Sequence, residues 1–126
     1  MLSQARIHAT LPASDLARAR RFYEGVLGFP PDVQDDGVLY RTVDGSEFLV
    51  FPSSGRPSGT HTQLGFTVGD LASEMADLAS RGVAFESYDF PGFDRSTSIA
   101  TFSGSRSAWF KDTEGNLLGV VEFAND

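Results

Sequence analysis

The sequence predicts an α+β fold built from two tandem modules, each with one strand, one helix and then three strands (βαβββ). Two landmarks support this fold class, because each occurs twice and in the same order. The first is HATLPASDL at 8–16, repeated as QLGFTVGDL at 63–71, and the second is DGSEFLVF at 44–51, repeated as EGNLLGVV at 114–121. We expect a single domain over 1–126, with module one at about 1–55 and module two at about 56–126.

A helix is predicted after the first landmark of each module. Apolar residues recur at three- and four-residue spacing over 16–27 and over 71–79, which places them on one face of each helix. The aspartates that precede these segments, Asp15 and Asp70, are typical N-cap residues, and Gly82 suits a left-handed C-cap. This structural role accounts for both aspartates, so we assign a catalytic or ligand-binding role to neither of them.

Three strands should follow each helix. In module one we expect a short edge segment near 29–34, weakened by Pro30-Pro31, then a hairpin turn at Asp36-Gly37, a strand at 38–43 and the landmark strand. In module two the corresponding strands are expected at 83–88 and 105–112. The first landmark repeats after 55 residues and the second after 70, so module two holds an insertion, which we place in a loop at 88–104.

Composition excludes several classes of function. The chain has seventeen acidic and ten basic residues, a net charge of −7, which argues against nucleic acid as a partner. It has no cysteine, so disulfides, thiolate catalysis and cysteine-based zinc sites are excluded. No apolar run is long enough to span a bilayer and no signal-peptide pattern opens the sequence, so we expect no membrane association and a cytoplasmic location.

Three segments resemble the vicinal oxygen chelate superfamily, the group of glyoxalases, bleomycin resistance proteins and ring-cleaving dioxygenases. They are SDLARARRFYEGVLGF at 14–29, GDLASEMADLASRGV at 69–83 and AWFKDTEGNLLGVVEF at 108–123. The resemblance covers essentially the whole chain. It implies two βαβββ modules with curled mixed sheets around a cleft, commonly in a homodimer.

The resemblance also implies where a metal ion would be held. In metal-bearing members, one ligand comes from the first strand and one from the last strand of each module, and the landmarks carry these positions to His8, Leu49, Gln63 and Gly119. Leucine and glycine offer no side-chain donor, so we expect no metal cofactor. The alternative is a divalent metal ion bound by His8, Gln63 and Glu47, since Glu47 shares the strand face of Leu49.

We therefore expect a small-molecule-binding protein with a largely apolar cleft. Its predicted lining is His8, Leu49, Gln63, Trp109 and Gly119, joined by Phe90 and Phe93 of the 88–104 loop. That loop is read either as a lid or dimer contact or as packing onto its own domain. Glycine at 119 should leave open space, and the acidic charge is compatible with a cationic, antibiotic-like ligand, as in the drug-sequestering branch of the family.

Two enzymatic alternatives stay open at this point. One is a metal-dependent lyase, isomerase or dioxygenase of the same superfamily that uses a different ligand set. The other is a metal-free enzyme in which His8 acts as general base. The second histidine, His61, is expected at an exposed strand end, with the cleft mouth as the alternative. No pattern assigns a catalytic residue.

Overall fold

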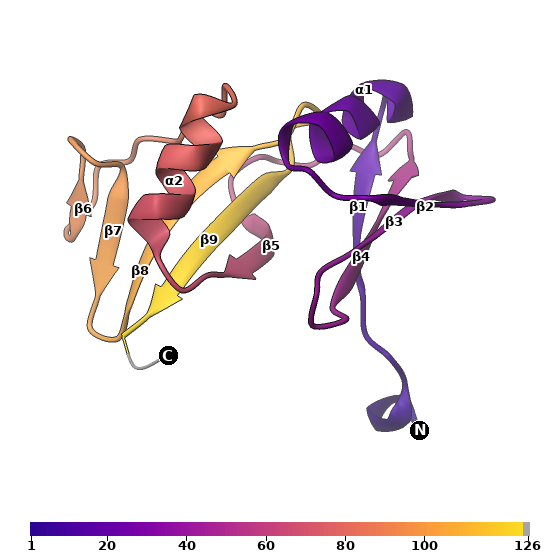
Figure 1. Cartoon of the computed structure of the whole chain (residues 1–126), viewed down its shortest axis with the longest axis horizontal. Helices are drawn as coiled ribbons and strands as arrows, with labels where there is room; N and C mark the ends of the chain where they lie inside the picture. The colour runs from indigo at the N-terminus through magenta and orange to yellow at the C-terminus, as the bar shows by residue number, and fades with distance from the viewer. Residues whose placement is uncertain (125–126) are drawn as a thin grey trace. The chain divides into compact units, whose positions relative to one another are not determined.

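A computed structural model describes residues 1–124, which form an α+β fold with two mixed sheets, as the sequence predicts. By its internal contacts, the chain divides into two compact units, Met1–Arg56 (unit 1) and a second that begins at Pro57 (unit 2). Each unit contains the order strand, helix and further paired strands, three of them in unit 1 and four in unit 2 (Figure 1). No helix within 1–124 has the length and apolar character that crossing a bilayer requires.

Unit 1 contains a four-stranded sheet in the order β1-β4-β3-β2, in which β1 runs parallel to β4 and the other pairs are antiparallel. Its elements are η1(Leu2–Gln4), β1(Ala9–Ala13), α1(Leu16–Arg20), the π-helical segment η2(Arg21–Val26), β2(Pro31–Gln34), β3(Gly37–Arg41) and β4(Glu47–Pro52). The prediction of an edge strand at Pro30-Pro31 is confirmed, since β2 lies at the end of the sheet. The segment before β1 extends away from the sheet (Figure 1).

One face of the unit 1 sheet packs against the helical segment and forms a core rich in aromatic rings. Tyr23 of η2 is fully buried and its ring lies 5.5 Å from those of Tyr40 and Phe48. The Tyr40 hydroxyl donates to Glu24 Oε2 at 2.9 Å, and Arg20 Nε donates to the same oxygen at 2.7 Å. The Arg20 guanidinium therefore lowers the pKa of Glu24, whereas burial, followed by Glu24, raises the pKa of Tyr40.

Unit 2 contains a five-stranded sheet in the order β5-β9-β8-β7-β6, with β5 parallel to β9 and the other pairs antiparallel. Its elements are β5(Thr62–Thr67), α2(Leu71–Ser80), β6(Phe93–Asp94), β7(Ile99–Phe102), β8(Ser105–Lys111) and β9(Leu117–Phe123). Figure 1 shows α2 lying across one face of β8 and β9. The opposite face of these two strands carries the residues described below.

The predicted strand at 83–88 and the predicted loop at 88–104 are both corrected by unit 2. In the described backbone, 83–88 is joined to β8 by an isolated bridge from Phe85 to Phe110 and a hydrogen bond from the Glu86 amide to the Trp109 carbonyl (2.8 Å), and it forms no regular strand. The loop region instead contains β6 and β7, and β7 pairs with the first half of β8. One edge of β8 is thus covered by two short segments: β7 lies along its first half and 83–88 along its second half.

Both predicted helix caps are confirmed. The carboxylates of Asp15 and Asp70 accept hydrogen bonds from the amides of Arg18 (3.0 Å) and Ser73 (3.1 Å). After α2, Gly82 adopts φ +92° and its amide donates to the Ala79 carbonyl, as expected of a left-handed cap.

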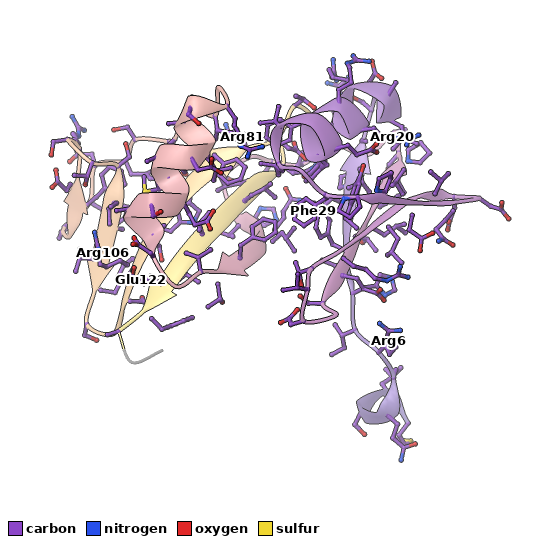
Figure 2. All side chains as sticks on the ribbon, in the orientation of Figure 1. Arg6, Arg20, Phe29, Arg81, Arg106 and Glu122 are labelled. Atoms are coloured by element: carbon purple, nitrogen blue, oxygen red, sulfur yellow. The ribbon has the colours of Figure 1, made fainter. Side chains whose placement is uncertain are left out.

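Glu122 of β9 faces the helix side of the unit 2 sheet, as its odd spacing from Gly119 predicts. Its Oε1 accepts from the Leu71 amide at 2.9 Å in the first turn of α2. Its Oε2 lies 3.5 Å from Arg106, and the two side chains are labelled beside each other in Figure 2. Glu122 therefore has a structural role at this helix terminus.

Candidate ligand cavity

Unit 2 contains an open cavity of about 330 Å³. Its wall is built by the segment leading into β5, the segment after α2, and single residues of β7, β8 and β9. The lining residues are Thr60, His61, Thr62, Tyr88, Phe90, Phe102, Trp109 and Leu117. A hollow of this size suits a small organic molecule, and a mainly apolar wall with few polar groups is the usual composition of such sites.

The aromatic side chains of the wall hold one another in place. Tyr88 meets Trp109 edge to face at 5.5 Å, and Phe90 stacks on Phe102 at 6.4 Å with an interplanar angle of 12°. Phe93 lies behind them, 5.6 Å from Tyr88 and 5.5 Å from Phe90. Of the two interpretations of the 88–104 segment, packing onto its own unit is therefore observed, and the same packing builds one wall of the cavity.

Trp109 lies on the sheet face opposite α2 and covers Gly119, its cross-strand neighbour. The indole Nε1 donates to Thr62 Oγ1 at 3.0 Å. A Cβ atom at position 119 would stand 3.2 Å from the Thr62 methyl and 3.3 Å from Trp109 Nε1. The expectation that Gly119 leaves open space is thus wrong, because the indole and the threonine methyl fill the region that a side chain would need.

We expect Gly119→Ala to destabilise the protein by about 1–2 kcal/mol, since either the indole or the threonine must move. Gly65→Ala is the matched control: Gly65 is the partner of Gly119 on β5, and no atom of residues 1–124 outside its chain neighbours lies within 4 Å of its would-be Cβ. This control should be neutral or slightly stabilising. Urea denaturation followed by the fluorescence of the single tryptophan measures both. Equal stability of the two variants would contradict the packing of Trp109 on Gly119.

A β-bulge at Gln63 changes which residue of β5 faces Trp109. Thr62 pairs with Leu117 and Leu64 pairs with Leu118, so Gln63 is the extra residue between them. Thr62 therefore lines the cavity in place of Gln63, which the strict alternation of a strand would have favoured. The Gln63 side-chain oxygen is buried and has no hydrogen-bond partner among residues 1–124.

The polar side of the cavity is a short exposed segment, Ser58 to Thr62. Ser58 Oγ lies 2.8 Å from His61 Nδ1 and 2.9 Å from Thr60 Oγ1. The same Ser58 oxygen accepts from the Thr60 amide at 3.2 Å. His61 is exposed directly before β5, and it also lines the cavity.

Within the described part of the chain, no carboxylate or basic side chain other than His61 lines the cavity. The nearby Glu86 carboxylate is 3.6 Å from the Lys111 ammonium. Burial, followed by Glu86, raises the pKa of the Tyr88 phenol, so Tyr88 is uncharged at neutral pH. The acidic charge of the chain is therefore not concentrated on the cavity wall.

The predicted site residues of unit 1 lie on its own sheet. His8 is exposed directly before β1, and Leu49 is half-buried on β4 between Thr10 and Leu39. Glu47 is held by two guanidiniums, Arg6 at 3.2 Å and Arg41 at 2.9 Å. Figure 2 shows Arg6 on the segment that leads into β1.

These side chains do not fit a divalent cation. Leu49 and Gly119 provide no donor, Gln63 provides a neutral amide, and both oxygens of Glu47 already face arginines. Among residues 1–124, no group of three or more histidine, aspartate or glutamate residues gathers as a metal centre would require. His8 remains the one strong ligand type at the four positions implied by the resemblance.

Of the seven pocket residues predicted from sequence, the cavity brings together Trp109 and Phe90, with Phe93 behind them and Gly119 beneath the indole. His8, Leu49 and Gln63 do not line it. Thr60, Thr62 and Leu117 were not predicted: strand register places Thr62 and Leu117 at the site, and Thr60 lies in the segment just before β5. Tyr88 and Phe102 carried a recognisable signal, as aromatic residues of the 88–104 segment.

The sequence matches the family model of the Glyoxalase/Bleomycin resistance protein/Dioxygenase superfamily over residues 6–120. The chain belongs to this superfamily. By sequence, no curated protein matches it. The resemblance noted from the three sequence segments is thereby confirmed, and so is the two-module fold that this superfamily implies.

Solved structures show the same superfamily fold. The chain is similar to UcmS2, with a TM-score of 0.72 and 18% identity over 94% of this chain and 98% of that one. It is also similar to TnmS3, an antibiotic-binding protein from Streptomyces sp. CB03234, with a TM-score of 0.67 and 19% identity over 96% and 98% of the two chains. A glyoxalase/bleomycin resistance protein/dioxygenase from Alicyclobacillus acidocaldarius gives a TM-score of 0.70 at 20% identity over 98% and 94%.

Proposed function

We propose that this chain is a small-molecule-binding protein of the superfamily, with an aromatic organic ligand held in the unit 2 cavity and no metal ion in the site. The observation that carries the proposal is the wall itself: four aromatic side chains around about 330 Å³, with hydroxyl and imidazole groups on one side. Aromatic walls bind flat ligands by stacking and by burial of apolar area.

The membership of the family and the fold of TnmS3, an antibiotic-binding protein, support a binding function. The side chains at the four metal positions support a site without metal, because two of them have no donor atom. The homodimer and the cytoplasmic location expected from sequence stay predictions.

The binding function is tested with 2-naphthol as an aromatic probe on protein treated with a chelator. The chain has one tryptophan, so the indole N–H signal in a proton–nitrogen NMR spectrum reports on Trp109 alone. We expect this signal to shift in a saturable manner, since the indole lines the cavity. An unchanged indole signal at saturating probe would overturn the proposal.

A metal-dependent lyase, isomerase or dioxygenase is the competing function, and metal titration separates the two. We expect nickel, zinc, manganese and ferrous ions to show no stoichiometric binding to untagged protein in isothermal titration calorimetry, because the donor set is incomplete. His8→Ala is the matched variant and should behave like the parent. Binding of one ion per chain that is lost in His8→Ala would refute the metal-free site.

A further inference from the structure

We propose that the cavity selects an uncharged aromatic ligand that bears a hydrogen-bonding oxygen, and that His61 is the residue that recognises this oxygen. The inference rests on the proposed binding function and specifies its ligand class. The wall of the cavity is asymmetric. Its apolar part consists of the rings of Tyr88, Phe90, Phe102 and Trp109, and its polar part consists of Thr60, His61 and Thr62.

The polar groups differ in what they can still bind. The Thr62 hydroxyl accepts from the Trp109 indole at 3.0 Å, and the Thr60 hydroxyl is 2.9 Å from Ser58 Oγ, so each of these hydroxyls has part of its hydrogen-bonding capacity in use. His61 uses Nδ1 for Ser58, at 2.8 Å. Its Nε2 has no hydrogen-bond partner among residues 1–124, which leaves this nitrogen for a ligand in the cavity.

Ser58 fixes the imidazole without fixing its tautomer. When the Ser58 hydroxyl donates to Nδ1, Nε2 carries the proton and donates to a carbonyl-type oxygen; when Nδ1 donates to Ser58, Nε2 accepts from a hydroxyl. Either arrangement satisfies an oxygen on the ligand. A phenolic or carbonyl oxygen at the rim of a flat ring system is therefore the complementary group.

The charges around the cavity favour an uncharged ring over a cation. No carboxylate of residues 1–124 lines the wall, and the nearby Glu86 carboxylate already faces the Lys111 ammonium at 3.6 Å. A cation would then have only uncharged groups, the ring faces and the hydroxyls of the polar part, to offset its lost hydration, which costs more than transferring a neutral ring of the same size. The cationic ligand considered from the net charge of −7 thus meets no carboxylate of the described residues on this wall.

The test compares two isosteric probes, 2-naphthol and 2-methylnaphthalene, which differ by a hydroxyl in place of a methyl group. Affinities are measured from the Trp109 indole N–H shift in the parent and in His61→Phe, which keeps a planar ring but removes both nitrogens. We expect the parent to prefer 2-naphthol by about tenfold and His61→Phe to show a preference of about twofold or less. The affinity for 2-methylnaphthalene should stay unchanged.

Two further variants separate recognition from general effects. Ser58→Ala removes the partner of Nδ1 and should give an intermediate preference, because the imidazole is still present but no longer oriented. His8→Phe changes the other histidine, which is exposed on unit 1, and should match the parent.

The outcomes distinguish this inference from the proposed function. If both probes bind the parent equally well, or if His61→Phe keeps the preference, the role of His61 is refuted while the binding function stands. If neither probe shifts the indole signal, the binding function itself fails. If the 2-naphthylmethylammonium cation binds more tightly than 2-naphthol, the uncharged ligand class is refuted.

Discussion

Replacement of Trp109 by alanine is expected to weaken 2-naphthol binding by about 10- to 100-fold. The indole is the largest side chain of the cavity wall and also anchors Tyr88, whose ring meets it at 5.5 Å. Loss of one stacking aromatic platform typically costs about 1–3 kcal/mol, which corresponds to this range. Isothermal titration calorimetry measures the change, because the variant lacks the spectroscopic reporter.

Two variants control for this expectation. Trp109→Phe keeps an aromatic ring but loses the hydrogen bond to Thr62, so it should retain part of the affinity. Phe123→Ala removes an exposed aromatic residue of β9 that does not line the cavity, and it should leave binding unchanged. A similar loss in Phe123→Ala and Trp109→Ala would show that the cavity is not the binding site.

Replacement of Gly37 by alanine should cause the largest loss of stability, about 3–5 kcal/mol. Gly37 opens β3 with φ +155°, and a Cβ atom there would overlap the Val50 carbonyl oxygen and lie 3.0 Å from Phe51 Cα. Both obstacles are backbone atoms of β4, so relief requires the strands to separate. Backbone strain and overpacking of this kind each cost about 1–3 kcal/mol.

Gly45→Ala is the matched control for Gly37→Ala. Gly45 also has a positive φ, +90°, and lies in the next hairpin of unit 1, but no described residue other than its chain neighbours lies within 4 Å of its would-be Cβ. The control should lose only the conformational term, about 1 kcal/mol. Urea denaturation followed by far-ultraviolet circular dichroism compares the two, and equal losses would rule out the steric contribution of Val50.

The helices and the order of the modules could be predicted because their signals are local. Asp15 and Asp70 begin their helices through contacts three residues away, and Gly82 ends α2 through its own backbone. The strand β7 could not be predicted in the same way. Ile99–Phe102 is short and lies in a polar, turn-rich segment, and its extended conformation depends on pairing with β8.

The site was predicted only in part for a related reason. Spacing along β5 pointed to Gln63, but the bulge places Thr62 against Trp109, and a shift of one residue exchanges the two faces of a strand. The acidic residue Glu47 looked available from its position, whereas in the folded unit Arg6 and Arg41 contact it. Arg41 is the cross-strand neighbour of Glu47 on β3, and Arg6 lies on the segment that leads into β1. Their contact with Glu47 depends on how β1 and β3 pair with β4, which the local sequence does not show.

The pairing of Trp109 with Gly119 has a counterpart in the other copy of the module. The same two strand positions of unit 1 hold Leu39 and Leu49, which are also cross-strand partners. Unit 1 thus has two side chains of medium size at these positions, whereas unit 2 has one very large side chain opposite a glycine. Exchange of one arrangement for the other takes two substitutions. The first of them gives either a tryptophan–leucine pair, which is larger than both arrangements, or a leucine–glycine pair, which is smaller than both. The two copies are therefore expected to diverge at these positions by compensated pairs, a constraint on their evolutionary history that acts through volume.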